Sequence, residues 1–429
     1  MANGSDTAVK VAGSDEALGK TRKAQKSSSW FRKPVLAKLA TITRGEIEIR
    51  EATETVVVGK TSPDFPLRVT VEVHDATLYS DIAASGSIGA AESYMAGKWS
   101  VSDLTGLVRI FAANPHALDS LENGSAKIIC SALRLGHRLR RNSRRQSRKN
   151  ILAHYDLGDE LFELFLDPTM SYSSAIYPSD VSTLEEAAVH KLDVVCQKLK
   201  LQPDDHVLEI GTGWGGLAMH AATKYGCRVT TTTISDNQFQ VASERIRARG
   251  LQDRITVLKQ DYRDLEGEYD KLVSIEMIEA VGHEYLDTYL EVCSQRLKPQ
   301  GRALIQAILM SDRNFDNYIR SVDFIQKYIF PGGALPSMAS LTQSMKRATD
   351  LQIADFHDIT MDYARTLNDW RSRFMDKLRD VRALGYPEEF IRMWEFYLCY
   401  CEGGFSERTI ATAQIVLDKP YCRLEKASV

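Results

Sequence analysis

The chain has 429 residues, of which 44% are hydrophobic and 26% are charged, and its formal net charge is −3. This is the composition of a globular protein, and the length exceeds what a single core usually organises, so we expect two domains. The apolar runs are far shorter than the ~20 residues of a membrane-spanning helix, and residues 1–29 lack the apolar core of a signal peptide.

The cysteines and histidines show no spacing typical of a metal site. The seven cysteines are odd in number and widely scattered, so we expect reduced thiols in a cytoplasm. His154, His283 and His357 are too dispersed to share a metal ion. The sequence therefore predicts neither a metal centre nor a disulfide framework.

The N-terminal part predicts a small α+β domain over residues 30–133. Residues 1–29, rich in Ser, Gly, Lys and Ala, are expected to be a disordered tail. Two of the strand-like segments alternate with period two, as half-buried strands do. The expected strands cover 46–50, 55–58 and 67–73, and the expected helices cover 35–39, 89–96 and 101–113.

A basic stretch separates this domain from the rest of the chain. Residues 134–149 contain eight arginines or lysines and no acidic residue, so we predict a linker over 134–150. An anionic membrane surface would attract such a run, at about 1 kcal/mol per basic residue. Nucleic acid is the less favoured partner because no aromatic residue interleaves the run to stack bases. A solvated spacer is the remaining alternative.

Residues 151–423 predict a second, larger domain in which strands and helices alternate. Alternation of this kind favours a parallel sheet with helices on both faces and ligands at the carboxyl ends of the strands. The expected strands cover 206–210, 227–233, 254–259, 270–275, 301–308, 353–358 and 409–417. The expected helices cover 214–225, 235–249, 284–297, 316–328, 339–349, 364–383 and 386–401. The later helices would form a lid, which an apolar substrate would need.

The glycine-rich turn after the first of these strands indicates a nucleotide-type cofactor. The sequence VLEIGTGWGG (207–216) runs from an apolar strand through Gly211 and Gly213 into a helix. Glycines at such a turn let the backbone approach a ligand closely. The pattern also satisfies the dinucleotide fingerprint, which requires an acid at the end of the second strand.

Two features of this region favour S-adenosylmethionine over a dinucleotide. The second strand, 227–233, ends in threonine hydroxyls instead of a carboxylate. Glu209, just before the turn, can meet the cationic amino-acid end of S-adenosylmethionine. A dinucleotide enzyme and a structural turn without a ligand are the alternatives that these residues leave open.

Several segments in order together resemble the cyclopropane-fatty-acyl-phospholipid synthase family. They are HYDLGDELFELFLD (154–167), MSYSSAIY (170–177), LEIGTGWGGLA (208–218), TTISDNQ (232–238), QDYRDL (260–265), SIEMIEAVGHE (274–284), KYIFPGGALPS (327–337), DYARTL (362–367) and FYLCYCEGGF (396–405). AESYMAGKW (91–99) resembles the smaller domain of the longer members. The resemblance implies a Rossmann-like class I methyltransferase domain with extra lid helices, preceded by a smaller α+β domain for lipid binding or dimerisation.

The resemblance also implies which residues contact S-adenosylmethionine. They are Tyr172, Ser173, Gly211, Gly213, Thr233, Gln238, Tyr262 and Arg263. The local chemistry agrees, because Ser235 can cap the helix that it begins and leave Gln238 free to reach a ribose hydroxyl. Tyr262 can cover the face of the adenine.

The family binds a bicarbonate ion beside the transferred methyl group. The resemblance places its ligands on Ser174, Glu279, Gln306, Ile308 and Tyr363. Position 174 is usually Cys and position 306 usually His in the family. If the backbone N–H of residue 174 holds the bicarbonate, Ser can replace Cys there at little cost. Gln306 keeps a hydrogen-bond donor but cannot titrate near neutrality as His does.

Further side chains are expected around the reacting atoms. Tyr172, Tyr363 and Phe405 could stabilise a carbocation through their aromatic faces. Cys401 matches a family position near the active site, where a buried Cys is usually a small hydrophobe. Glu276, three residues before Glu279, could crowd this site or be solvated, and the sequence does not decide between the two.

The resemblance implies an enzyme that transfers a carbon from S-adenosylmethionine to the cis double bond of unsaturated phospholipid acyl chains, which gives cyclopropanes. A carbocation would be deprotonated with the help of bicarbonate. Formation of mid-chain methylene or methyl branches, a methyltransferase for a small soluble acceptor, and a lipid-binding module with a vestigial cofactor fold are the alternatives. We expect a cytoplasmic protein, peripherally bound to the inner face of the membrane, with a homodimer implied only by the resemblance.

Overall fold

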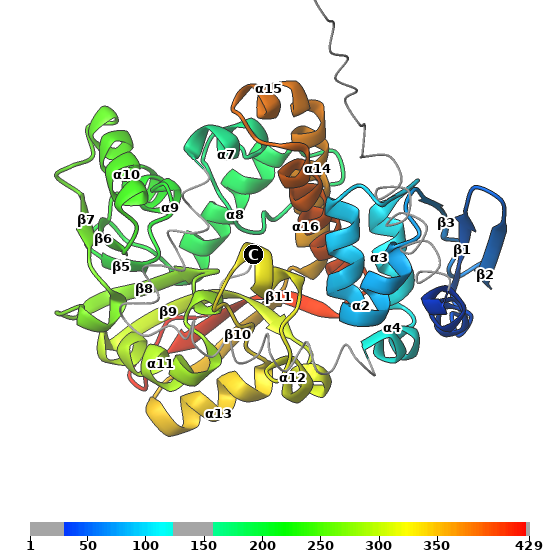
Figure 1. Ribbon diagram of the computed structural model, residues 1–429. Coiled ribbons are helices and arrows are strands. Elements are labelled where there is room, and N and C mark those ends of the chain that lie inside the picture. Colours follow the sequence, from blue (N-terminus) through cyan, green and yellow to red (C-terminus); the bar gives the residue numbers. More distant parts are fainter. Residues whose placement is uncertain (1–29, 123–157, 426–429) are drawn as a thin grey trace, which may run out of the picture. The chain divides into compact units, whose positions relative to one another are not determined.

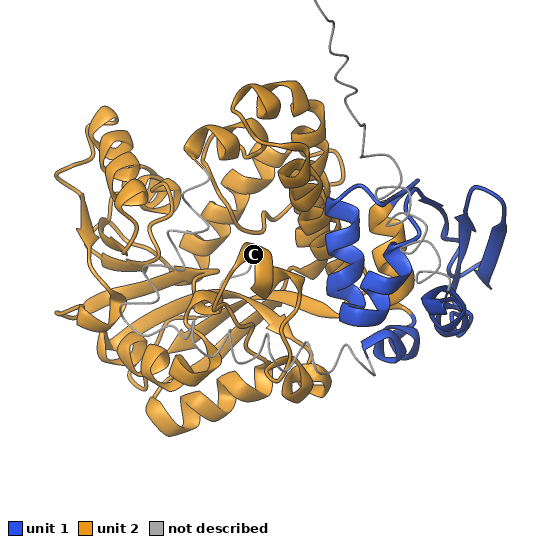
Figure 2. Ribbon diagram, in the orientation of Figure 1, with its two compact units in different colours: residues 1–103, 114–129 blue, residues 104–113, 130–429 orange. Residues whose placement is uncertain are grey.

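The computed structural model describes residues 30–122 and 158–425. The described chain forms two compact units (Figure 2): unit 1 contains residues 30–103 and 114–122, and unit 2 contains residues 104–113 and 158–425. The predicted tail (1–29) and basic linker (134–150) lie outside the described residues. Residues 104–113, expected in the N-terminal domain, group with unit 2.

Unit 1 contains a four-stranded sheet in the order β2-β1-β3-β4. The expected strands are confirmed as β1 (Gly45–Arg50), β2 (Thr55–Lys60) and β3 (Arg68–Val73), and β4 (Trp99–Val101) completes the sheet. The unit also contains a helix over 30–39, α2 (Leu78–Met95) and α4 (Pro115–Glu122). The helix predicted to begin at residue 89 begins eleven residues earlier, at Leu78. The helix predicted over 101–113 is shorter, because β4 occupies its start; it is α3 (Leu104–Ala112), which belongs to unit 2.

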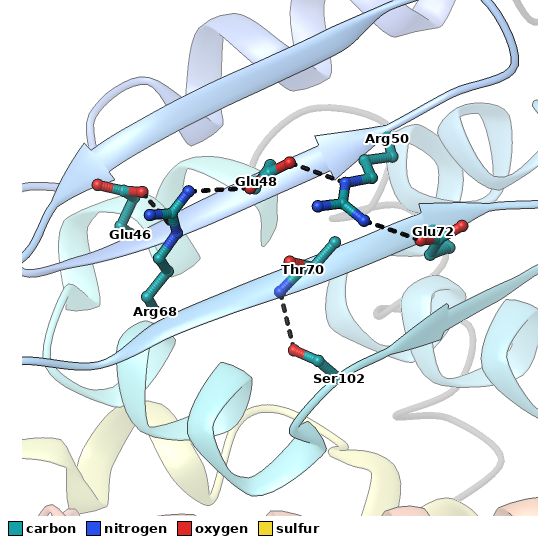
Figure 3. Close-up of polar contacts among 7 residues, drawn as sticks. All are labelled: Glu46, Glu48, Arg50, Arg68, Thr70, Glu72 and Ser102. Carbon is teal, nitrogen blue, oxygen red and sulfur yellow. Dashed lines mark hydrogen bonds and ion pairs between the residues drawn. The ribbon is translucent and has the colours of Figure 1, made fainter.

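One face of this sheet carries alternating acidic and basic side chains (Figure 3). Ile47 and Ile49 of β1 are buried, so the residues between them face the other way. Arg68 pairs with Glu46 and Glu48, both at 3.0 Å. Arg50 pairs with Glu48 at 2.7 Å and more loosely with Glu72 on β3. The strands are thus joined on this face by partly exposed ion pairs.

Unit 2 is built around a seven-stranded sheet in the order β10-β11-β9-β8-β5-β6-β7 (Figure 1). The strands from β9 to β7 in this order are parallel, and β11 and β10 add antiparallel strands at one edge. Every expected strand is confirmed: β5 (His206–Ile210), β6 (Arg228–Thr233), β7 (Ile255–Lys259), β8 (Tyr269–Ile275), β9 (Leu297–Met310), β10 (Gln352–Asp358) and β11 (Ile410–Asp418).

Helices cover both faces of this sheet because its strands are apolar on both sides. Leu208 and Ile210 of β5 pack in one core with α11 (Leu286–Gln295) and α13 (Met338–Ala348). Val207 packs in another core with α8 (Leu184–Leu199), α9 (Gly216–His220) and α10 (Asp236–Ala248). Glu209 alternates with Leu208 and Ile210, so it lies on the α8 face.

Further helices accompany the sheet: α7 (Asp159–Phe165), α12 (Asp312–Tyr318), α14 (Thr360–Asp376), α15 (Leu378–Ala383) and α16 (Glu388–Ser406). The prediction of one helix over 316–328 was wrong, since α12 ends at Tyr318 and a π-helix covers Ile325–Ile329. The Asp323 carboxylate accepts from the Gln326 N–H and starts the second segment. Within the described ranges, every helix is too short or too polar to cross a bilayer.

Candidate functional site

The glycine turn after β5 leaves open space above its backbone. Gly211 and Gly213 have φ angles of 104° and 51°, which side-chain-bearing residues rarely adopt. A Cβ at Gly213 would meet no atom within 4 Å, whereas one at Gly216 would lie 2.8 Å from the carbonyl oxygen of Thr169. Gly216 therefore permits a close approach of the 169 loop, and Gly213 forms a cradle for a ligand.

Glu209 supplies a buried acid directly before this turn. Its side chain is 3% exposed, its Oε2 has no hydrogen-bond partner, and its neighbours in the crevice between the sheet and α8 are apolar. Burial raises the pKa of Glu209 to about 8. A buried carboxyl with one unpartnered oxygen fits the ammonium group of S-adenosylmethionine, which would favour its charged form.

The expected ribose and adenine contacts lie at the ends of β6 and β7. Ser235 caps α10 by accepting from the Gln238 N–H, as predicted. The Gln238 Oε1 accepts from the Thr233 hydroxyl at 2.8 Å, which leaves the Gln238 amide N–H groups for a ligand. Tyr262 packs edge-on against the buried Tyr289, with ring centroids 5.6 Å apart.

Arg263 is held in place by the residue that begins its short helix. Asp261 accepts from Arg263 at 2.6 Å, and the guanidinium lies 5.4 Å from the centre of the Tyr262 ring. The bidentate pair raises the pKa of Arg263. The side chain is thus a fixed cation beside the expected adenine position.

The second cluster converges on Glu276, which directly follows β8. Its Oε1 accepts from the Ser174 backbone N–H at 2.9 Å and from the Gln306 amide at 2.8 Å, and its Oε2 accepts from the Tyr363 hydroxyl at 2.7 Å. These donors are three of the groups that sequence resemblance assigned to bicarbonate. In this structure all three donate to a carboxylate of the protein itself.

The backbone of Glu276 is in the left-handed region, with a φ of 48°. Such conformations cost about 1–3 kcal/mol in residues other than glycine and cluster at functional sites. The strain is offset by the three hydrogen bonds to the carboxylate and by a fourth from the Glu276 N–H to the Gln306 carbonyl, at 2.8 Å. The turn aims the carboxylate inward.

The amide of Gln306 has only one orientation that satisfies its neighbours. The carbonyl oxygen of Ser174 can only accept, so the Gln306 atom facing it, at 3.3 Å, is the nitrogen. Gln414, directly opposite on β11, donates to the Gln306 Oε1 at 3.0 Å. Gln306 therefore presents N–H groups, and Glu276 accepts one of them.

Glu279 is the second carboxyl of this cluster. Its Oε1 accepts from the Ile308 N–H at 2.5 Å, and its Oε2 is buried without a partner. Burial, reinforced by the charge of Glu276, raises the pKa of Glu279 to about 8. Burial also raises the pKa of Glu276, but three donors oppose that effect. The three donors thus favour the ionised form of Glu276, and the raised pKa of Glu279 favours its protonated form at neutral pH.

Aromatic rings surround these carboxyls. Tyr363 stacks on Phe405 with centroids 4.5 Å apart. Tyr172 stacks on Trp370 at 5.3 Å, and its hydroxyl lies 2.8 Å from that of Tyr397. Cys401 lies one turn before Phe405 on α16, and burial raises the pKa of its thiol, so it is a neutral wall residue.

Sequence reasoning left the role of Glu276 undecided and missed Lys191 and Gln414. The Lys191 ammonium, 2% exposed on α8, donates to the Ser173 hydroxyl at 2.8 Å. The sequence did contain a sign of Lys191, because it lies among the apolar residues of α8, between Ala188 and Val195, where a lysine is rare. Gln414 gave no such signal, since only strand pairing shows which residue it faces.

The parallel sheet, the glycine turn with its buried acid and the polar residues at the strand ends define a class I S-adenosylmethionine-dependent methyltransferase. The family model described as mycolic acid cyclopropane synthetase matches residues 142–415. The chain belongs to this family, and it is an S-adenosylmethionine-dependent lipid methyltransferase.

Characterised relatives cover most of the chain. Tuberculostearic acid methyltransferase UfaA1 of Mycobacterium tuberculosis is 40% identical over 76% of this chain and 77% of its own length. Cyclopropane-fatty-acyl-phospholipid synthase of Escherichia coli is 38% identical over 81% of this chain and 87% of its own. The structure of mycolic acid cyclopropane synthase CmaA1 complexed with SAH and CTAB matches with a TM-score of 0.59 and 30% identity, over 63% of this chain and 98% of that one.

Proposed function

We propose that the enzyme transfers one carbon from S-adenosylmethionine to the cis double bond of an unsaturated phospholipid acyl chain and releases a cyclopropane-containing chain. The observation that carries this proposal is the half-buried carboxylate of Glu276, held by Ser174, Gln306 and Tyr363. An anion held in place by three donors suits a reaction that develops positive charge.

S-adenosylmethionine supplies an electrophilic methyl group, whose transfer forms one C–C bond and leaves a cation on the acyl chain. The Glu276 carboxylate faces this charge in a water-poor site, where attraction is far stronger than in water. The stacked rings of Tyr363 and Phe405 present aromatic faces to the same region, each worth up to about 2 kcal/mol when desolvated.

Glu276 is also the group best placed to remove the proton. Gln306 cannot act as a base, and its N–H groups point toward Glu276. Burial raises the pKa of Glu276, which makes it a stronger base than an exposed carboxylate. We therefore propose that Glu276 takes the place that the family resemblance gives to bicarbonate.

The carbon that loses the proton determines the product. Loss from the added methyl group closes a three-membered ring, and loss from a neighbouring chain carbon gives an exocyclic methylene. A separate reductase would convert the methylene into a methyl branch. The second outcome is our alternative, favoured by the 40% identity to a relative named tuberculostearic acid methyltransferase.

Apolar side chains support a hydrocarbon substrate. Phe324 packs on Phe396 with centroids 4.8 Å apart, and Phe330 packs edge-on against Tyr397 at 6.2 Å. We further propose peripheral binding to the anionic inner face of the membrane through the basic run 134–149, which lies outside the described residues. Homodimerisation through unit 1 is a further proposal.

The test is lipid analysis after incubation of the enzyme with unsaturated phospholipid vesicles and S-adenosylmethionine, in carbonate-free buffer with and without added bicarbonate. We expect each modified chain to gain one CH2 in both buffers. Mild hydrogenation before mass spectrometry adds two hydrogens to a methylene product and leaves a cyclopropane intact. Unchanged lipids in both buffers would contradict the proposal, and methylation of a soluble acceptor without vesicles would favour a small-molecule enzyme.

The variant Glu276→Gln tests the base, and Glu276→Ala provides a rescue. We expect E276Q to lose about 10²–10⁴-fold in turnover, the usual contribution of a general base. The smaller side chain of E276A should admit a free carboxylate such as formate, which would restore part of the activity. Full activity of E276Q, or a bicarbonate requirement in the wild type, would show that Glu276 is not the base.

A further inference from the structure

Lys191 is a buried cation that the reaction described above does not use. It lies on α8 with 2% of its surface exposed, and its Nζ donates to the Ser173 hydroxyl at 2.8 Å. No carboxylate of the described residues lies within ion-pair distance of it, although Glu276, Asp167 and Glu209 all influence it electrostatically. Burial lowers the pKa of Lys191, and attraction to the three carboxyls opposes that effect. A buried ammonium with a single hydrogen bond is costly unless a further partner compensates its charge.

The hydrogen bond to Lys191 fixes what Ser173 can do. The charged form of Lys191 only donates, so the Ser173 oxygen is then the acceptor and the hydroxyl hydrogen is left to donate elsewhere. Ser173 is buried, and its hydroxyl makes no second hydrogen bond within the described residues. Lys191 thereby turns Ser173 into a polarised donor that needs an acceptor.

The neighbours of Ser173 indicate which acceptor this is. The next residue, Ser174, contacts Glu276 at the reaction site. Lys191 also interacts electrostatically with Glu209, which lies beside the glycine turn. The amino-acid end of S-adenosylmethionine carries an ammonium and a carboxylate. Glu209 suits the ammonium, and the Lys191–Ser173 pair suits the carboxylate.

We propose that Lys191, acting through Ser173, is the positioning residue that recognises the carboxylate of the cofactor's amino-acid end. The inference rests on the proposed function, since it requires a cofactor bound at the glycine turn. It deepens that function by assigning the two charges of the amino-acid end to two different side chains. Correct placement of this end fixes the sulfonium methyl group relative to Glu276.

Calorimetric binding of two ligands tests this role without turnover. S-adenosylhomocysteine keeps the carboxylate, and decarboxylated S-adenosylhomocysteine lacks only that group. A hydrogen bond to a charged group is worth about 1.5–3 kcal/mol, so Lys191→Met should weaken S-adenosylhomocysteine binding by about 10- to 100-fold. The decarboxylated ligand should bind K191M and the wild type equally.

The matched control is Lys198→Met, which removes another buried lysine from α8. Lys198 is 3% exposed and faces Asp355 at 3.8 Å, so its loss should lower stability without changing either affinity. Ser173→Ala should reproduce the K191M pattern, and it replaces K191M if circular dichroism shows that K191M is unfolded.

Two results would overturn the inference. Equal weakening of both ligands by K191M would show a structural role for Lys191, and unchanged affinity for S-adenosylhomocysteine would show no role. Failure of the wild-type enzyme to bind S-adenosylhomocysteine would instead refute the proposed function, and the inference with it. The wild-type titration therefore separates the two failures.

Discussion

In unit 1, Glu46 and Glu48 pair with the half-exposed Arg68 on the surface of a sheet (Figure 3). In unit 2, Glu276 and Glu279 are half-buried just after the end of β8, and no arginine or lysine of the described residues pairs with them within ion-pair distance. The same residue type is thus held by opposite charges in one sheet and by neutral donors in the other.

The difference shows where a carboxylate affects function. An exposed ion pair exchanges hydration for a weak, screened attraction and contributes little. A buried carboxylate without a cation has a raised pKa, and it remains available to stabilise a positive charge or to accept a proton. Four changes, given from the largest expected effect to the smallest, can test this comparison.

The largest effect should come from Arg302→Met in unit 2. Arg302 is 2% exposed and forms a bidentate pair with Asp418 at 2.7 and 2.9 Å. Loss of one member of a buried pair leaves the other uncompensated, so we expect the free energy of unfolding to fall by about 3 kcal/mol. Denaturant titration measures the free energy of unfolding. A decrease no larger than that caused by removing an exposed ion pair would contradict the prediction.

Tyr363→Phe should affect the reaction more than the fold. The lost hydrogen bond to Glu276 favoured the ionised carboxylate, so the pKa of Glu276 should rise. We expect turnover to fall by about tenfold or more, and the acidic limb of the pH–rate profile to move to higher pH. A profile identical to that of the wild type would exclude Tyr363 as the donor.

Glu279→Gln should flatten the pH dependence of stability. The pKa of Glu279 is raised to about 8 in the folded chain, so its stabilising effect is complete below the unfolded pKa and is lost as pH rises toward 8. Between pH 6 and 8 the wild type should lose about 2 kcal/mol more than E279Q. Parallel stability curves for the two proteins would refute the assignment.

Arg68→Met in unit 1 should have the smallest effect. Its side chain is 59% exposed, and both ion pairs are open to solvent screening. We expect an unfolding midpoint that cannot be distinguished from that of the wild type at physiological salt. A marked loss would mean that the charged face of this sheet is protected from water.

Most of the fold could be predicted because strands and helices leave periodic patterns. All of the strands expected in residues 151–423 are found, and Ser235 caps α10 as its sequence position suggested. The helix over 316–328 was wrong because Asp323 offers a local capping bond that competes with helix continuation. The grouping of residues 104–113 with α16 was not predictable, because Gly403 permits an approach that only packing reveals.

The site was predictable in its residue types and not in its connections. Resemblance placed Ser174, Gln306 and Tyr363 around one anion, and the structure brings all three to one carboxylate. The anion itself could not be inferred, because Glu276 would look the same in sequence whether it faced water or the site. Its inward direction depends on a left-handed backbone at the end of β8.

By itself, the sequence determined the alternation of strands and helices and the glycine turn, since periodicity and backbone freedom are local properties. The family motifs in the sequence, taken together, indicated the cofactor class. The tertiary structure alone decided that Glu276 faces inward, that Gln414 orients Gln306 across two antiparallel strands, and that Lys191 lies behind Ser173. These relations join residues far apart in the chain, and their strength depends on burial, which no short segment of sequence specifies.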